Sequence, residues 1–474
     1  MKRTMVWLLS LMMALSAAGC AASEGPAAAG DNPSGSEQEA GQEKEEEIKE
    51  NESKAAEDAE VITEAVYPEM LPFPIMEDYE DMEAYEKDYT AWFESKKALD
   101  PGISGLPEEL RDFFEKSTIQ ILSGCRENRN YSPMSLYMAL SMLAEAAEGD
   151  TRSQLLEVLG SSDMDSLREM SRNLWLANYS DDKMTESILS NSVWTRNDME
   201  YRQEAVDFLT KDHFASVFRG KMGSEAYDKM LQKWLSEKTG GMLDDMISGE
   251  RFDETAFLTL VSAVYYRDRW LTEFNPVLTQ KGTFHGTDGD TEADFMHENE
   301  SGSIYRGDTF TAIVRFFLGG ERMWLILPNE GMTSDDVLAD PGLKEMIYDP
   351  EVWERVDYGK VDIALPKFDV SSEIQLTEDL KALGVDLIFD PEKADLSALL
   401  GDSSVPVSDV RQNARLKIDE YGCEAAAYTA VTALGGVLPE DQEQYEFIAD
   451  RPFIYVQMGI SDMPLFIGTV NTVN

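Results

Sequence analysis

The sequence predicts a mixed α+β fold in which helices come first and strands dominate the last third of the chain. Residues 105–160 carry apolar side chains at helical spacing. Residues 257–270 and 322–328 are rich in the aromatic and β-branched side chains of buried strands. Residues 361–370 alternate apolar and polar side chains, which is typical of an exposed strand.

The first predicted helix is "LPEELRDFFEKSTIQILSG", which we expect to end at Gly124. Two more helices are predicted within residues 128–160. The pair Ser132-Pro133 supplies a cap and a first turn for the earlier of these two helices, and Gly149 marks its end. Together these segments make the helical first part of the fold.

The composition limits the classes of partner that the chain can bind. Of 474 residues, 91 are acidic and 41 are Lys or Arg, which gives a net charge of −50. Such a charge argues against nucleic acid, whose phosphates require basic patches. It also argues against attraction to an anionic membrane surface. The apolar content of 43% is enough for a sizeable core.

Residues 1–20, "MKRTMVWLLSLMMALSAAGC", have the layout of an export signal. The small residues before Cys20 resemble the bacterial lipoprotein box, in which the cysteine is lipidated after cleavage. Ala17 stands where Leu is commoner, so ordinary signal cleavage is the alternative. We therefore expect an exported protein that is lipid-anchored at a bacterial cell surface through Cys20, or secreted if this cysteine is not lipidated. No other segment is long and apolar enough to cross a bilayer.

Two acidic segments separate this signal from the body of the protein. Residues 21–63 are predicted to be a disordered tether, because residues 37–60 hold eleven acidic side chains and little that could be buried. Residues 64–103 are predicted to be an extension that packs on the body, with partner binding as the alternative. Its predicted helix presents one face made of Met82, Tyr85, Tyr89 and Phe93.

A catalytic or metal-binding function finds little support in the sequence. Cys125 and Cys423 are too few for a disulfide framework. The three histidines, His213, His285 and His297, lack ligand spacing, so no metal or other cofactor is predicted. "SDDK" (180–183) and "KTG" (238–240) echo serine β-lactamase signatures, but the first lies in a polar turn and the second at a helix end. We therefore expect that the chain is not an enzyme.

Several longer motifs follow one another in a fixed order: "NYSPMSLYMALSMLAEAAEGDT", "NSVWTRN", "KMLQKWLSEKTGGML", "LTLVSAVYYRDRWLTEF", "ALPKFDVSSEIQLTEDLKALGV" and "DRPFIYVQ…LFIGTV". Through them, residues 104–474 resemble the serpins, a family of serine-protease inhibitors. The resemblance implies N-terminal helices, a large central β-sheet, further sheets and an exposed reactive-centre loop. It also implies a monomeric suicide inhibitor, whose loop is cleaved by the protease and then inserts into the main sheet.

The resemblance gives a role to "EYGCEAAAYTAVTALGGVLPED" (420–441), which helix propensity alone would make a short helix. Glu420 and Gly422 match the family's hinge. Because side chains alternate along a strand, four compact residues would face inward: Cys423, Ala425, Ala427 and Thr429. The alternate positions, Glu424, Ala426, Tyr428 and Ala430, would face solvent.

The family's spacing places the scissile bond between Gly436 and Val437. Counting back from "DRPF" gives Leu438 instead, so the bond is expected within the range from Leu434 to Pro439. These residues are small or aliphatic and include no Arg or Lys, which points to elastase-like or subtilisin-like proteases. The alternative is a serpin-shaped surface protein that binds a partner without inhibiting it.

Five residues occupy positions in the region where the family's sheet opens, which is called the shutter and breach. Ser132, Ser135 and Trp270 keep the family's residue type. Ser262 and Gln412 replace the usual Asn and His. The longer amide of Gln412 could reach the hydroxyl of Ser262 and keep one hydrogen bond between the strands, and the alternative is that each change is a harmless substitution.

Overall fold

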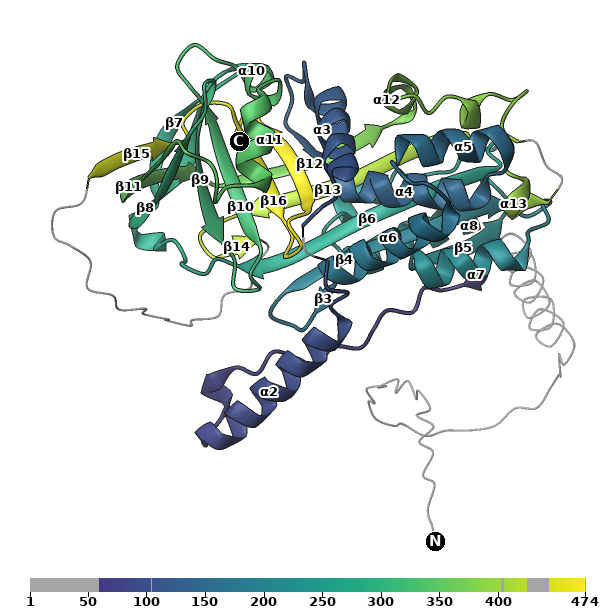
Figure 1. Cartoon of the computed structure of the whole chain (residues 1–474), viewed down its shortest axis with the longest axis horizontal. Coiled ribbons are helices and arrows are strands. Elements are labelled where there is room, and N and C mark those ends of the chain that lie inside the picture. The colour runs from purple at the N-terminus through teal and green to yellow at the C-terminus, as the bar shows by residue number, and fades with distance from the viewer. Residues whose placement is uncertain (1–58, 104, 402–404, 424–442, 474) are drawn as a thin grey trace, which may run out of the picture. The chain divides into compact units, whose positions relative to one another are not determined.

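A computed structural model describes residues 59–103, 105–401, 405–423 and 443–473. Two large β-sheets and the helices that cover them make up the structure (Figure 1). The described residues all belong to one compact unit. The predicted α+β class is confirmed, because helices fill most of residues 82–247 and strands dominate from β6 (Leu258–Arg269) onward.

The described helices are α2 (Met82–Leu99), α3 (Glu108–Leu122), α4 (Pro133–Ala146), α5 (Gly149–Val158), α6 (Met164–Asn178), α7 (Gln203–Asp212), α8 (Glu225–Lys238), α9 (Asp244–Ile247), α10 (Ser334–Leu338), α11 (Pro341–Tyr348), α12 (Thr377–Ala382) and α13 (Ser397–Leu400), with 3₁₀ helices η1 (Met76–Asp78), η2 (Pro276–Leu278) and η3 (Leu387–Phe389). None of them is long and apolar enough to cross a bilayer. Ser132 caps α4 by accepting a hydrogen bond from Ser135 N at 3.2 Å. The prediction that Gly149 ends this helix is wrong, since α4 ends at Ala146 and Gly149 opens α5.

The first sheet, which we call sheet A, has eight strands. Its order is β1-β5-β4-β6-β14-β13-β12, and β3 pairs with β4 outside this path. The strands are β1 (Ala59–Thr63), β3 (Ser180–Asp181), β4 (Glu186–Arg196), β5 (Ala215–Gly220), β6 (Leu258–Arg269), β12 (Phe368–Gln375), β13 (Asp409–Ile418) and β14 (Gly422–Cys423).

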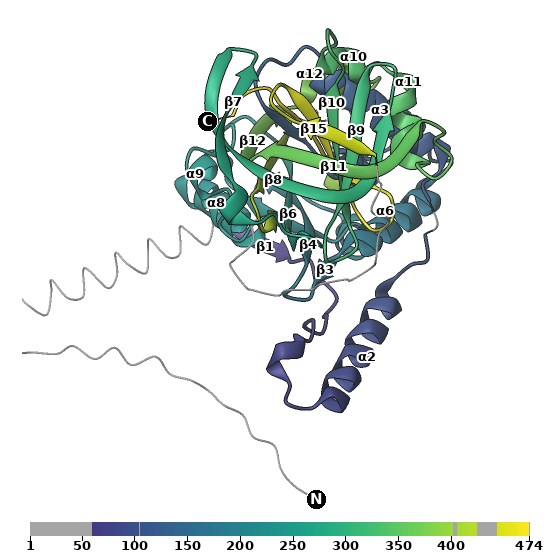
Figure 2. The same cartoon turned by 90° about the vertical axis from the view of Figure 1, so that its left-hand side faces the viewer.

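The second sheet, sheet B, has nine strands in the order β15-β11-β8-β9-β10-β16-β17-β2, with β7 paired to β8. Figure 2 shows β8 and β11 running side by side, and their antiparallel register joins Val356–Pro366 to the segment from Tyr305 back to Phe295. The strands are β2 (Arg129–Tyr131), β7 (Gln280–Gly286), β8 (Gly289–Arg306), β9 (Phe310–Phe316), β10 (Arg322–Pro328), β11 (Val356–Pro366), β15 (Gln444–Ile448), β16 (Phe453–Met458) and β17 (Pro464–Val470).

Sheet A is buried on both faces around its central strands. Neighbouring residues of β4 belong to different hydrophobic clusters, Val193 to the main core and Trp194 to a smaller one. In β6 the same alternation puts Leu260 in the main core and Val261 in the smaller cluster. Helix α4 contributes to the main core, and α8 covers the smaller cluster. Because β6 is buried on both sides, opening the sheet next to it disturbs packing on both faces.

The N-terminal extension joins the edge of sheet A. Strand β1 pairs antiparallel with β5, with Ala59 opposite Gly220. The structure therefore has a strand where the last five residues of the predicted tether lie, while residues 21–58 are outside the described residues. The apolar members of "AEVIT" and a free sheet edge explain the difference, since the edge offers the backbone hydrogen bonds that composition alone does not reveal.

The extension contacts the body through other residues than those of the predicted helix face. Helix α2 forms, and Met82, Tyr89 and Phe93 on its face are 54%, 39% and 49% exposed. The extension nevertheless packs on the body as predicted, because Tyr67 and Met70 lie against the main core. The turn at Asp182 adds polar contacts, since it receives the Trp92 indole N–H at 3.1 Å and the Phe73 backbone N–H at 2.7 Å.

Candidate functional site

Strand β14 begins a new strand in the middle of sheet A. After β13 the chain turns back at residues 419–421, and the two residues of β14 lie between β6 and β13. Cys423 pairs antiparallel with Asp268 of β6 on one side and with Ile418 of β13 on the other. These two pairs set the register of β14 between its neighbours.

Only glycine fits the first position of β14. Gly422 has φ +144°, a conformation that other residues rarely adopt. A Cβ at this position would lie 2.3 Å from the carbonyl oxygen of Asp268 and 2.7 Å from Cα of Arg269. The reversal of the chain onto β6 thus depends on the missing side chain of Gly422.

Cys423 is fully buried, and its thiol donates a hydrogen bond to the backbone oxygen of Tyr266 at 3.3 Å. The remaining predicted residues of the hinge and of the scissile bond lie outside the described residues: Glu424, Ala425, Ala426, Ala427, Thr429, Leu434, Gly436, Val437 and Leu438.

Below β14, strands β6 and β13 pair directly with each other. Their parallel ladder joins Thr259–Ala263 to Asp409–Asn413 in five register pairs. β14 separates the same two strands at their other end, where Cys423 stands between Asp268 and Ile418. Sheet A is therefore closed at one end of these strands and divided at the other.

An ion pair holds the start of the hinge. The Glu420 side chain is buried, accepts a hydrogen bond from Lys367 Nζ at 2.7 Å and another from the Thr279 hydroxyl at 2.8 Å. Burial alone would raise the pKa of Glu420, but the hydrogen bonds from Lys367 and Thr279 outweigh it and lower that pKa below its ordinary value. Phe274 N also donates to the Glu420 backbone oxygen at 3.0 Å. The carboxylate is thus kept ionised where the chain turns toward β14.

Trp270 fixes the turn between β13 and β14 from the other side. Its indole N–H donates to Asp419 O at 3.1 Å, and its backbone N–H donates to Tyr421 O at 2.9 Å. The ring is buried and stacks on Phe317 with the centroids 4.3 Å apart. Trp270 therefore connects the turn after β9 to the hinge backbone.

The predicted hydrogen bond between Gln412 and Ser262 is wrong. The two residues are register partners on β13 and β6, yet the Gln412 amide bonds both backbone groups of Ser132, accepting from its N–H at 2.8 Å and donating to its oxygen at 2.9 Å. Ser262 donates instead to Asn191 Oδ1 on β4 at 2.8 Å. The longer Gln side chain reaches past the sheet to the start of α4, where it satisfies two buried backbone groups at once. Ser135 contributes its backbone N–H to the cap of the same helix.

A family model described as "Serpin (serine protease inhibitor)" matches residues 116–473, most of the chain. The chain belongs to the serpin family. Serpins are protease inhibitors and not enzymes, and most of them inhibit serine proteases. Among curated relatives, mouse neuroserpin is 27% identical over 396 residues, which cover 79% of this chain and 94% of neuroserpin. An uncharacterized serpin-like protein of Thermococcus kodakarensis is 26% identical over 344 residues, which cover 70% of this chain and 78% of that protein.

Solved serpin structures share the fold. The native state of the thermophilic serpin tengpin has a TM-score of 0.69 at 22% identity, covering 78% of this chain and 96% of tengpin. Serpin48 of the insect Tenebrio molitor has a TM-score of 0.66 at 24% identity, covering 78% of this chain and 98% of that structure. The predicted serpin fold is therefore confirmed.

Three residues of this site were not predicted: Asn191, Lys367 and Thr279. Asn191 lies in the motif "NSVWTRN", where a polar residue in a buried strand was an available signal. Lys367 lies in "ALPKFDV", where a lysine between two strands was an available signal. Thr279 lies beside η2 and carries no such signal. Among the residues that the structure describes, no cluster of three or more His, Cys, Asp or Glu side chains is suited to a metal ion.

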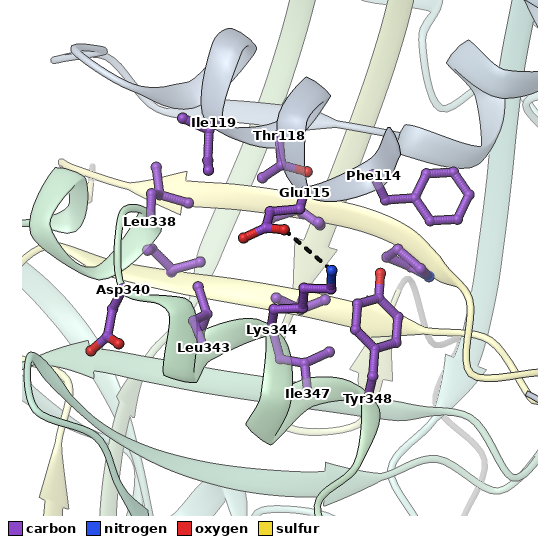
Figure 3. A pocket seen from close by; sticks show the side chains of 14 residues that line it. Phe114, Glu115, Thr118, Ile119, Leu338, Asp340, Leu343, Lys344, Ile347 and Tyr348 are labelled. Atoms are coloured by element: carbon purple, nitrogen blue, oxygen red, sulfur yellow. Dashed lines mark ion pairs between the residues drawn. The ribbon is translucent and has the colours of Figure 1, made fainter. Parts of the chain in front are cut away.

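A separate cavity of about 50 Å³ lies between α3, α11 and strands β16 and β17. Figure 3 shows Glu115 pointing toward Lys344 from the facing helix, with Phe114, Ile347 and Tyr348 around them. Lys344 is held by three carboxylates, those of Glu108, Asp112 and Glu115. Because the cavity is small and its one lysine is already neutralised, we assign it no part in the site.

Proposed function

We propose that this serpin is a suicide inhibitor of extracellular serine endopeptidases of the elastase-like or subtilisin-like kind. The observation that carries this proposal is the position of Cys423, which is buried and paired between β6 and β13. A segment that begins in this way can continue as a strand if its inward side chains are compact. The inward residues that follow in the sequence are Ala425, Ala427 and Thr429, which meet that condition.

The proposed reaction starts at the bond between Gly436 and Val437. The protease serine attacks the carbonyl carbon of the first residue, an ester forms, and the amine of the second residue leaves as a new N-terminus. Hydrolysis of the ester would free the protease. Entry of the cleaved segment into sheet A carries the ester-bound protease away from the site of cleavage before water completes that step.

The sheet favours this entry through its hydrogen bonds. The five parallel register pairs between β6 and β13 would be replaced by antiparallel ladders on both sides of the new strand, extending the pairs that Cys423 already makes. One parallel ladder is thus exchanged for two antiparallel ladders, which are slightly more stable per residue. This exchange supplies a driving force that an ordinary nicked loop lacks.

Thermal unfolding before and after nicking tests the proposal. A non-target protease is used to cut between Leu434 and Pro439, and mass spectrometry confirms the fragments. Cutting an exposed loop of an ordinary protein adds freedom to the chain and does not stabilise it. We expect the nicked serpin to unfold at a distinctly higher temperature. A nicked form that unfolds at or below the temperature of the intact form would contradict inhibition by insertion.

Incubation with elastase provides the direct assay. An inhibitor gives a band at the summed mass that survives boiling on a denaturing gel. Simple clipping without this band favours the alternative, a serpin-shaped surface protein that does not inhibit.

For localisation we propose export and lipid anchoring through Cys20, with the folded part acting as a monomer outside the cell. The sequence of residues 1–20 supports this, and Cys20→Ala tests it. We expect the variant to be released from the membrane. Incorporation of labelled palmitate into Cys20→Ala would contradict the lipoprotein assignment.

A further inference from the structure

Two carboxylic acids lie buried beneath the hinge, where the proposed mechanism does not use them. Asp268 is 0% exposed and Glu321 is 3% exposed. A Cβ on Gly319 would lie 2.7 Å from Asp268 Oδ2 and 2.3 Å from Glu321 Oε2, so these two oxygens are at most about 5 Å apart. Within the described part of the chain, neither acid has an ion-pair partner.

A proton shared by the two acids fits their hydrogen bonds. Asp268 accepts backbone N–H groups on both oxygens, from Arg269 at 2.7 Å and from Gly319 at 3.0 Å. Glu321 Oε2 is buried and receives no donor from the described residues. A proton on Asp268 that points to Glu321 would satisfy this oxygen, whereas two carboxylates would repel each other in a medium of low dielectric constant.

Burial raises the pKa of both acids, and the charge of Glu321 raises the pKa of Asp268 further. Other titratable groups act on the pair with opposing signs. Lys96 lowers the pKa of Glu321, while Asp182 raises it. The titratable side chains around the pair are Lys96 of α2, Asp182 in the turn after β3 and Tyr266 of β6. Arg269 contributes its backbone N–H, and the Cys423 thiol of β14 lies against Tyr266.

None of these neighbours supplies a compensating cation at contact distance. The Arg269 guanidinium is bound by Glu273. The Tyr266 hydroxyl lies 3.5 Å from Asp268 Oδ2, and burial raises the pKa of this tyrosine as well, so it remains a neutral donor. Lys96 acts on the pair without an ion pair at contact distance, and a shared proton supplies the remaining charge balance.

The turn that carries Glu321 is connected to the hinge. Leu318 N donates to Arg269 O at 2.8 Å, and Phe317 stacks on Trp270. Trp270 in turn binds the backbone oxygens of Asp419 and Tyr421. Displacement of the turn would therefore disturb the residues that hold the chain before β14.

We propose that Asp268 and Glu321 form a proton-dependent contact that regulates entry of the loop. With the shared proton, the pair holds the turn at Gly319 against the end of β6. When the proton is lost at higher pH, repulsion between the two carboxylates loosens this turn and, through Trp270, the hinge. The proposal rests on the proposed inhibitory function, and it makes insertion faster in alkaline than in acidic surroundings.

Glu321→Gln tests this contact. The Gln amide can donate to an ionised Asp268, so the variant keeps a hydrogen bond and has only one charge. The readout is the rate at which iodoacetamide alkylates Cys423, followed by mass spectrometry of the peptide that contains it. Wild type and variant are compared at each pH, so that the ionisation of the thiol itself cancels. Glu378→Gln, which changes a carboxylate that is 84% exposed, is the control.

From about pH 5 to about pH 9, we expect the ratio of wild-type to Glu321→Gln rates to rise by at least about threefold, while Glu378→Gln follows the wild type. A ratio that does not change with pH would overturn the proposal. Infrared titration of the wild type gives a second reading that needs no variant. We expect a protonated carboxyl band at neutral pH that disappears on alkalisation, and its absence at neutral pH would also overturn the proposal.

Complex formation with elastase separates this proposal from the function on which it rests. Boiling-resistant complexes together with a constant alkylation ratio mean that the serpin inhibits but is not regulated by the pair. A rising ratio without complexes means that the hinge responds to pH in a protein that does not inhibit.

Discussion

Lys367 donates a hydrogen bond to the carboxylate of Glu420 at 2.7 Å, and so ties the residue between β11 and β12 to the first residue of the hinge. The Glu420 side chain is 6% exposed and that of Lys367 is 38% exposed. The pair is therefore shielded on the side of the carboxylate and open on the side of the ammonium group. It contributes more than a surface ion pair, but less than a fully buried one.

Breaking this pair should loosen the hinge. Glu420→Gln and Lys367→Met are each expected to lower the unfolding midpoint by roughly 2–4 °C, and the double variant by less than the sum, because the two changes remove the same interaction. Differential scanning fluorimetry at neutral pH measures this. Glu225→Gln, which disrupts an exposed pair with Lys229, should have little effect. Strict additivity would show that Glu420 and Lys367 do not interact.

The same pair predicts a dependence on pH. The pKa of Glu420 is lowered in the folded protein, so its contribution to stability is present above the pKa of the unfolded state and is lost as the pH falls through the folded value. The wild type should therefore lose more stability on acidification than Glu420→Gln does. Unfolding midpoints measured at neutral pH and near pH 4 provide the comparison. Equal losses in both proteins would contradict the assignment.

Gln412→Met removes both hydrogen bonds to Ser132 while keeping a side chain of similar length. Two buried backbone groups at the start of α4 are left unpaired, and we expect a loss of about 1–3 kcal/mol in the free energy of unfolding. Chemical denaturation measures it. The matched control is Gln203→Met, because Gln203 donates to Asp207 on the surface. Equal effects of the two substitutions would argue against a role of Gln412 at the junction of α4 and β13.

Gly422→Ala should prevent β14 from docking, since the added Cβ would meet the Asp268 carbonyl oxygen at 2.3 Å. Cys423 would then lose its place between β6 and β13, and its thiol should be alkylated at least about tenfold faster, equivalent to roughly 1.4 kcal/mol. Gly249→Ala is the control, because nothing lies within 4 Å of a Cβ at that position. Unchanged protection of Cys423 would show that β14 tolerates a side chain.

Thr429→Arg tests the inward face of the inserting segment. Counting by twos from the buried Cys423, Thr429 falls on the inward face, where an unpaired charge costs several kcal/mol. Insertion should slow while hydrolysis continues, so that elastase cleaves the variant instead of being trapped. The ratio of cleaved inhibitor to boiling-resistant complex measures this. Ala430→Arg changes the outward face and should still inhibit, and the same ratio in both variants would contradict strand insertion.

The strands and helices of the body could be predicted because local pattern and tertiary environment agree there. The segment 257–270 became β6 and the segment 322–328 became β10, since both are apolar strands in a buried sheet. The hinge residues Glu420 and Gly422 could be located only through the resemblance to a family, because helix propensity favours a different structure for the same residues.

Contacts between distant segments could not be predicted. Residues 59–63 of the predicted tether became β1 because β5 offers a free edge, and this edge cannot be inferred from the sequence of those five residues. Gln412 lies opposite Ser262, but the Gln412 side chain bonds Ser132 at the start of α4. The Ser262 side chain bonds Asn191 on β4. These hydrogen bonds depend on which segments the fold places next to each other. The contact between Asp268 and Glu321 depends on the fold in the same way.

The two residues of β14 also constrain how this serpin can evolve. Because Cys423 already fixes which side chains point inward, the loss or gain of a single codon between Cys423 and Thr429 would turn every later side chain to the opposite face. Where the change precedes Tyr428, the Tyr side chain would then point into the core. Related sequences should therefore differ in the length of this stretch by even numbers of residues. Beyond the inserted strand, the length of the loop can change by a single residue.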